Sequence, residues 1–240
     1  MTQNLIINNE EIVSNFNIYT KNLGYTIAGG IIVGLLLIAL VALLTYLFIF
    51  KYKKDKQGFI FEHNVTSKLK DAARRNNMYF IEGGVFSYDG NMFEIDGIIF
   101  NENIAVVVET KAYKDNISGL AESSELQLTD RKGKKFAIGN PILQNTKHIK
   151  HLYKLANIKF SAYSLIVFQD GATFNISNIP SHTIIINENA IDETIRDVVI
   201  ETNNSLNKFD AKYLLKVLKD MKIKRVYEKN KFNNLVKGKK

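Results

Sequence analysis

An uncharged stretch near the N-terminus constrains this chain more than any other feature. Residues 22–50, NLGYTIAGGIIVGLLLIALVALLTYLFIF, contain no charged side chain. At about 1.5 Å per residue, a helix of this length exceeds the roughly 30 Å hydrocarbon thickness of a bilayer. The sequence therefore predicts a single membrane-spanning helix over residues 22–50, with the lipid bilayer as its partner.

A cleaved signal peptide is the alternative interpretation of this stretch. It is disfavoured because Glu10 and Glu11 precede the stretch instead of a basic run, and because the apolar segment is too long. KYKKDK at 51–56 carries four Lys, whereas only Lys21 lies before the stretch. By the positive-inside rule, we expect a single-pass protein of the cell membrane with its N-terminus outside and its C-terminal domain in the cytoplasm.

Composition adds two constraints. The chain contains no Cys, which excludes disulfides, thiolate metal sites and a cysteine nucleophile. The net charge is +8, and the first 50 residues hold only one Lys against two Glu, so the basic excess belongs to the rest of the chain. This balance favours a polyanionic partner, either nucleic acid or an anionic membrane face. Gly30 and Gly34 have the small-xxx-small spacing that allows a homo-oligomer within the membrane.

The chain after the apolar stretch predicts an α/β domain. Apolar spacing and turn residues indicate a helix over about 58–75, three antiparallel strands within 78–113, a loop with an edge hairpin over 115–135, a helix from Pro141, strands near 162–169 and 181–186, and helices near 191–203 and 210–221. We expect turns at Asp89-Gly90 and Glu102-Asn103. The predicted regions are an extracytoplasmic N-terminus (1–21), the membrane helix (22–50), a basic juxtamembrane linker (51–57), a globular domain (58–190), and C-terminal helices with a basic tail (191–240).

Charged residues interrupt two of the predicted apolar strands. If Glu102-Asn103 form a two-residue turn, Asp96 lies across from Glu109 and Glu94 lies across from Lys111, with Cβ atoms about 4.5–5.5 Å apart. Two facing carboxylates destabilise a sheet unless a cation or a proton lies between them. A divalent metal ion between Asp96 and Glu109 is the simplest interpretation of this pattern.

The alternative is that these are solvated residues on a polar face of the sheet. Strand alternation would place Ile98 and Phe100 on the face of Asp96, and Ala105 and Val107 on the face of Glu109. Such apolar neighbours favour a half-buried site over a solvated face. Structural ion pairs produce the same pattern, however, so the residues alone leave both interpretations open.

These motifs resemble the nuclease-related domain (NERD) family, a branch of the PD-(D/E)XK, restriction-endonuclease-like superfamily. The resemblance runs from about residue 58 to 168 and is carried by four motifs in order: GFIFE (58–62), EIDGIIF (94–100), VVVETKAY (106–113) and NPILQNTKHIKHL (140–152). It implies a restriction-endonuclease-like core of helix, three-strand antiparallel meander, helix and strand. It also implies a nuclease domain over 58–190.

The resemblance further implies a metal-dependent nuclease that hydrolyses phosphodiester bonds of DNA or RNA with Mg²⁺ or Mn²⁺. Asp96 and Glu109 would bind the metal, Lys111 would position or activate the attacking water, and Glu62 would hold a second metal or a metal-bound water. Gln144 matches the Gln of the family's Asn-Pro-x-x-Gln element. His148 stands where related nucleases carry Tyr, so this chain departs from their pattern at that position.

The helix from Pro141 is expected to contact nucleic acid. Gln144, Lys147, His148 and His151 share one helical face, and phosphate binding requires such cations. The alternative is an ordinary solvated basic face. The rival to the whole enzymatic interpretation is a non-catalytic, membrane-tethered module that binds nucleic acid or recruits proteins through the same surface.

Overall fold

The computed structural model describes residues 2–224, with the backbone alone for 2–10, 24, 50 and 52–56. The chain divides into two compact units, Met1–Lys56 and Gln57–Lys240. Helix α1, Thr2–Arg75, begins in the first unit and ends in the second. Residues 51–57, predicted as a linker, are therefore helical. Most of the predicted basic tail lies outside the described residues.

The first unit contains the predicted membrane segment. Within α1, Glu11–Ile49 is long and apolar enough to cross a membrane, and its most apolar window has no buried residue. A signal sequence near an N-terminus can also meet this criterion of length and composition. The structure thus contains an apolar helix over the predicted 22–50 span, and its length and composition are what support the membrane assignment.

The second unit is a mixed α/β domain with two mixed sheets. The larger sheet has the order β1-β2-β3-β7-β9, built from β1 (Tyr79–Tyr88), β2 (Asn91–Phe100), β3 (Ala105–Lys111), β7 (Ala162–Phe168) and β9 (Thr183–Asn187). The first three strands form the predicted antiparallel meander, and β7 and β9 continue the sheet parallel to β3. The predicted helix, three strands, helix and strand occur in this order, but three further strands, which belong to a second sheet, lie between the meander and the second helix.

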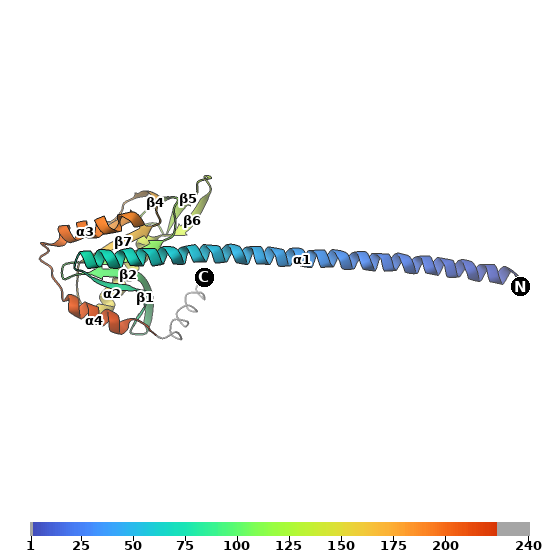
Figure 1. Ribbon diagram of the computed structural model, residues 1–240, viewed down its shortest axis with the longest axis horizontal. Helices are drawn as coiled ribbons and strands as arrows, with labels where there is room; N and C mark the ends of the chain where they lie inside the picture. Colours follow the sequence, from blue (N-terminus) through green and yellow to red (C-terminus); the bar gives the residue numbers. More distant parts are fainter. Residues whose placement is uncertain (1, 225–240) are drawn as a thin grey trace. The chain divides into compact units, whose positions relative to one another are not determined.

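Helices cover both faces of the larger sheet. On one face, α2 (Pro141–Ala156) and α4 (Ala211–Met221) bury a cluster that includes Phe86, Phe100, Leu152 and Leu214. On the other face, the C-terminal part of α1 and α3 (Ile191–Thr202) bury a cluster that includes Leu69, Val106 and Ile195. Figure 1 shows α3 and α4 on opposite sides of the domain. The strands β3 and β7 are almost continuously buried, as expected for strands covered on both faces.

The second sheet corrects one prediction. The segment 115–135, predicted as a loop with an edge hairpin, contains β4 (Asn116–Leu120) and β5 (Glu125–Thr129), which pair with β6 (Lys135–Gly139) and with the unpredicted β8 (Thr173–Ser177) in the order β6-β5-β4-β8. Each strand has five residues and at most two buried side chains. Such short, half-exposed strands leave a weak alternation in the sequence. The short 3-10 helix η1 (Glu188–Ala190) links β9 to α3.

Both predicted turns of the meander are confirmed. Asp89 and Gly90 have positive φ angles of 45° and 76°, as a type I′ hairpin turn requires. At the second turn, the Asn101 backbone N–H donates to the Ile104 carbonyl over 3.1 Å and closes a two-residue connection. The resulting register pairs Gly97 with Val108. This is the predicted register, and it sets the position of the charged residues.

Candidate active site

The candidate site lies where strands β2 and β3 separate. Their ladder ends at Gly97 and Val108, one position before Asp96 and Glu109. Beyond this point the backbone amide of Thr110 has no partner on β2 within the ladder, and the Asp96 side chain takes that place. Asp96 Oδ2 accepts hydrogen bonds from the Thr110 backbone N–H at 2.7 Å and from the Thr110 hydroxyl at 2.8 Å.

The electrostatic environment of Asp96 disfavours its ionised form. Burial raises the pKa of the Asp96 carboxyl to about 6, and the nearby charge of Glu109 acts in the same direction. The two hydrogen bonds from Thr110 and the charge of Lys111 lower the pKa but do not offset burial. A cation placed at Asp96 would relieve this cost, because it stabilises the ionised carboxylate.

The face of Asp96 differs from the prediction. Ile95 and Ile98 pack in the same core cluster against α2 and α4, although simple alternation would place them on opposite faces. The alternation therefore shifts by one residue between them. Asp96 lies instead beside Thr66 and Leu69 of α1, in a cavity on the other side of the sheet. Its expected grouping with Ile98 and Phe100 is wrong, because the end of the ladder releases the strand from regular pleating.

Glu109 is deeply buried and takes its partners from the other side. Its side chain is 1% exposed, and its Oε1 lies 2.5 Å from Lys111 Nζ. Its Oε2 lies 3.3 Å from His148 Nε2 of α2, but the geometry does not form a hydrogen bond, and this oxygen has no donor among the described residues. Glu109 and Lys111 share a face as predicted, and an ion pair joins them. One oxygen of a buried carboxylate is thus left without a hydrogen-bond donor.

Lys111 is held in its charged form by this pair. Burial lowers the pKa of Lys111, but the charge of Glu109 and its hydrogen bond raise it, and the net pKa lies above the ordinary value for Lys. The protonated amine is therefore a hydrogen-bond donor and a positive charge at the site. It is not a base at neutral pH.

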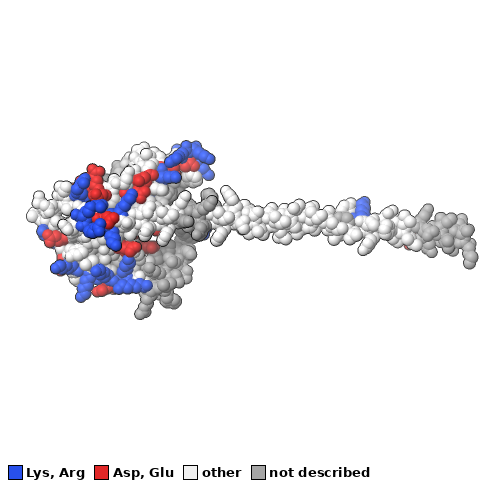
Figure 2. Space-filling model, viewed as in Figure 1, with Lys and Arg blue, Asp and Glu red and all other residues white. Residues whose placement is uncertain are grey.

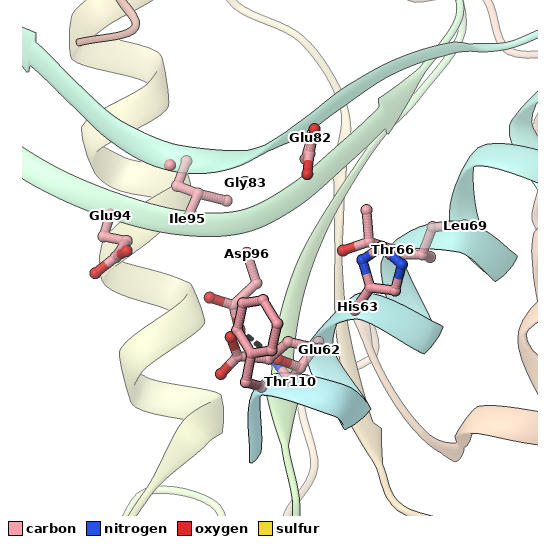
Figure 3. Close-up of a pocket in the computed structure, with 12 residues that line it drawn as sticks. Glu62, His63, Thr66, Leu69, Glu82, Gly83, Glu94, Ile95, Asp96 and Thr110 are labelled. Carbon is pink, nitrogen blue, oxygen red and sulfur yellow. Dashed lines mark hydrogen bonds between the residues drawn. The ribbon is translucent and has the colours of Figure 1, made fainter. Parts of the chain in front are cut away.

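An acidic cavity of about 320 Å³ opens beside Asp96 (Figure 3). Four carboxylates from three elements line it: Glu62 of α1, Glu82 of β1, and Glu94 and Asp96 of β2. Among the described residues that line it, none is Lys or Arg. Burial and then the charge of Glu94 raise the pKa of Glu62, against the opposing effect of Lys111. The cavity thus attracts cations and, without one, repels an anionic phosphate.

Glycines shape the wall of this cavity. A Cβ atom at Gly83 would lie 2.3 Å from the Asp96 carbonyl oxygen, so only glycine fits that position on β1. Gly84 has a φ of 155° and packs against the Lys222 side chain. Lys222 Nζ donates to the Glu82 carbonyl over 2.7 Å, and this bond joins the end of α4 to the cavity rim.

The donor set fits a hard divalent cation in part. Asp96 Oδ1 and Glu109 Oε2 are carboxylate oxygens without a hydrogen-bond donor in the described chain, and carboxylate oxygen is the ligand that Mg²⁺ prefers. Within residues 2–224, however, no three His, Asp or Glu side chains converge tightly enough to hold a metal by themselves. Mg²⁺ sites commonly use one or two carboxylates and complete the shell with water and phosphate oxygens. The residues fit a metal of that kind and do not form a closed structural site.

Comparison with known families decides the identity of this region. The sequence model of the nuclease-related domain (NERD) family matches residues 57–169. These residues form a NERD domain. Its family belongs to the PD-(D/E)XK superfamily. No curated protein and no solved structure gives a significant match to this chain.

Helix α2 of the NERD domain brings only part of its predicted face to solvent. Gln144 and Lys147 are exposed, whereas His148 is half-buried beside Glu109. His151 Nδ1 lies 2.8 Å from the Tyr88 hydroxyl, and its ring stacks on Phe93 with centroids 4.8 Å apart. Burial lowers the pKa of His151, and the charges of His148 and Lys154 act in the same direction.

Two asparagines of the NERD domain escaped the sequence interpretation. Asn140 caps α2 through its bond from the Ile142 amide at 2.9 Å, and its own amide donates to the Ala121 and Ser123 carbonyls. Asn145 is fully buried and donates to the Val107 carbonyl over 2.8 Å. The Asn-Pro pair marks the cap, since Asn favours that position and Pro the first helical turn. No local signal marks Asn145, because its partners lie on distant strands.

Proposed function

We propose that this protein is a metal-dependent nuclease that hydrolyses phosphodiester bonds of DNA or RNA. The NERD domain gives it a nuclease-related function. The observation that carries the proposal is a half-buried carboxylate, Asp96, and a fully buried one, Glu109, whose Oε2 lacks a donor among the described residues, next to the protonated amine of Lys111. An acid such as Asp96 that has no cation beside it, close to a fixed positive charge, is suited to holding a metal and a phosphate together.

The proposed roles follow from the geometry. Asp96 and Glu109 would hold Mg²⁺ or Mn²⁺ once the Glu109 carboxylate turns from α2 toward Asp96. Glu62 of α1, which lines the same cavity as Asp96, would be a ligand of a metal-bound water. When bound, the metal polarises the phosphate and supplies an activated water. Lys111, held protonated by Glu109, stabilises negative charge as it develops on the phosphoryl oxygens.

Gln144, exposed on the first turns of α2, orients the substrate. Lys147 contacts a phosphate, and His148 and His151 stabilise the helix face behind it.

The same proposal extends to the architecture. We infer that α1 from residue 57, the β1–β3 meander, α2 and β7 form a restriction-endonuclease-like core. We infer also that residues 22–50 anchor the protein in the cell membrane, with 1–21 outside, the domain at 58–190 in the cytoplasm, and a homo-oligomer formed through Gly30 and Gly34. The uncharged span and the Lys-rich segment after it support this placement.

A cleavage assay on the full chain tests the activity. Purified protein in neutral-lipid discs is incubated with DNA and RNA oligonucleotides and with Mg²⁺, Mn²⁺ or chelator. We expect cleavage that requires metal, and a loss of about 10²–10³-fold in Asp96→Asn and in Glu109→Gln. Lys219→Gln, on the exposed face of α4, serves as the matched control. Cleavage that persists in chelator, or is equal in all three variants, would refute the proposal.

A non-catalytic nucleic-acid-binding module is the second candidate. It is favoured by the 2.5 Å ion pair between Lys111 and Glu109, which already neutralises one of the two carboxylates. In that case the protein binds oligonucleotides without cutting them in either metal, and Asp96→Asn leaves binding unchanged. The same assay therefore separates the two functions.

A further inference from the structure

The acidic cavity itself attracts no phosphate backbone. In the part of the chain that the structure describes, its lining includes four carboxylates and no Lys or Arg. Proteins derive much of their affinity for nucleic acid from Lys and Arg placed against phosphates. If nucleic acid is the ligand, as the proposed function holds, another surface of the domain must bind its phosphate backbone.

The hairpin between β5 and β6 carries cations that could bind phosphates. Its tip, residues 130–135 (the basic hairpin), has the sequence DRKGKK, with Arg131, Lys132, Lys134 and Lys135 all exposed. None of these four forms an ion pair with another residue of the described chain. By contrast, Lys68, Arg74 and Arg75 on α1 are all paired with acids. Blue side chains gather in Figure 2 where Figure 1 shows this hairpin.

Hydrogen bonds order the basic hairpin. Asp130 Oδ1 accepts the backbone N–H groups of Lys132 and Lys134 at 2.8 and 2.9 Å, and the Gly133 N–H donates to the Asp130 carbonyl. Asp at the first and Gly at the fourth position are typical of a type I turn, and Gly133 has a φ of 80° that suits glycine. The Lys134 amine lies 4.9 Å from the Phe136 ring centroid. The cations are therefore presented on a preformed turn, which reduces the entropy lost on binding.

Strand register places the basic hairpin at the site end of the second sheet. Asn116, the first residue of β4, pairs with Thr129, the last residue of β5, so the tip projects past the start of β4. That start lies five residues after Lys111. At up to 3.6 Å per residue and about 5 Å between strands, Lys132 lies within roughly 33 Å of Lys111 along this path. A strand that rises 3.4 Å per nucleotide covers this distance in about ten nucleotides.

We propose that the basic hairpin binds the phosphate backbone of the nucleic acid on the flank of the cavity, within about ten nucleotides of the cleaved bond. The contact is independent of base sequence, because exposed Lys and Arg at a turn present charge and no fixed base-reading geometry. In this proposal the acidic cavity holds the metal, and the basic hairpin supplies the affinity for nucleic acid. The other anionic surface that it could meet is a membrane leaflet rich in phosphatidylserine.

The test uses the full chain in phosphatidylcholine discs. Arg131→Ala/Lys132→Ala/Lys135→Ala removes three cations and leaves Asp130, Gly133 and the Lys134–Phe136 contact intact. Lys212→Ala/Lys216→Ala/Lys219→Ala, on the exposed face of α4, is the control with the same change in charge. For a 30-nucleotide oligonucleotide we expect binding about 10- to 100-fold weaker in the hairpin variant. The slope of log K against log salt should fall by about two to three.

Equal losses in the hairpin and α4 variants would overturn the proposal, as would an unchanged salt slope. Normal oligonucleotide binding with weakened attachment to phosphatidylserine discs would assign the hairpin to lipid instead. Binding is also measured in the Asp96→Asn background with the metal chelated, so the result stands whether or not the protein cleaves. If it does cleave, the hairpin variant should cut a tetranucleotide at the normal rate, since so short a substrate does not reach the tip.

Discussion

Asp96 and Glu109 lie next to each other at the end of one strand ladder, yet the domain treats their charges in opposite ways. Glu109 faces α2, is almost completely buried, and has the amine of Lys111 at 2.5 Å. Asp96 faces α1, borders an acidic cavity, and receives only the neutral donors of Thr110. One carboxylate is compensated within the chain, and the other is left in need of a cation. Of the two, Asp96 is therefore the carboxylate whose charge a bound cation would stabilise more.

Removal of the Lys111 amine should have the largest effect on stability. Lys111→Met leaves Glu109 buried without its amine partner, and the loss of one partner of a buried ion pair costs about 3–5 kcal/mol. Thermal unfolding of the full chain at pH 8 measures the loss. Glu109→Gln/Lys111→Met should recover most of the stability, because no unpaired charge remains. A single variant as stable as the parent would mean that Glu109 is not compensated by Lys111.

Neutralisation of Asp96 should increase the stability of the folded state, whereas removal of the Lys111 amine should decrease it. Its pKa is about 6 in the folded state against 3.8 for an unperturbed Asp. The folded state therefore binds the proton more tightly than the unfolded state and loses stability as pH rises from about 4 to 6. Asp96→Asn escapes this loss and should be more stable than the parent by at most about 3 kcal/mol above pH 6. The gain should disappear below pH 4. Unfolding measured from pH 4 to 8 with chelator checks the prediction, and a gain independent of pH contradicts it.

A methyl group at Gly83 should disturb the surroundings of Asp96 and leave those of Glu109 unchanged. The added Cβ would meet the Asp96 carbonyl oxygen at 2.3 Å, and backbone atoms there cannot move away cheaply. We expect Gly83→Ala to destabilise the domain by about 1–3 kcal/mol and to weaken Mg²⁺ binding. Gly139→Ala, which would have open space around its Cβ, is the control. Equal stability of the two variants would show that β1 does not press on Asp96.

Loss of the His148 ring should have the smallest effect. Its Nε2 lies 3.3 Å from Glu109 Oε2 without a hydrogen bond, so removal of the ring opens space in which that carboxylate can turn. Partners of metal ligands typically contribute 10–100-fold to metal affinity or activity. We expect His148→Ala to raise the Mg²⁺ concentration needed for half-maximal activity about tenfold, and His148→Gln to recover part of it. Lys147→Ala should instead weaken oligonucleotide binding with the Mg²⁺ requirement unchanged.

The sequence predicted the parts of the site that depend on local rules. Turn residues at Asp89-Gly90 and around Glu102-Asn103 set the hairpin connections, and the register that follows from them is the observed one. The period of two placed Glu109 and Lys111 on one face, and their ion pair agrees with it. Pro141 correctly marked the start of α2. Each of these inferences needed only residues close together in the chain.

The parts that escaped prediction depend on contacts between distant segments. The second sheet pairs β4 with β8, which are more than fifty residues apart in the chain, and short half-exposed strands carry little pattern of their own. The sequence pattern of α2 is also compatible with a solvated basic face that includes His148. In the structure, packing of α2 on the sheet turns the His148 side chain toward Glu109. Asp96 lies on a different face of the sheet from the predicted one because the β2–β3 ladder ends beside it.

The sequence by itself determined an apolar helix near the N-terminus, an antiparallel meander and a carboxylate pair with a neighbouring Lys, because periodicity and turn chemistry act over a few residues. Only the tertiary structure decided that Asp96 borders an acidic cavity while Glu109 is paired with Lys111. The physical reason is desolvation: the pKa and the partners of a carboxylate are set by which helix covers it, and that covering arises from the packing of α1 and α2 on opposite faces of the sheet.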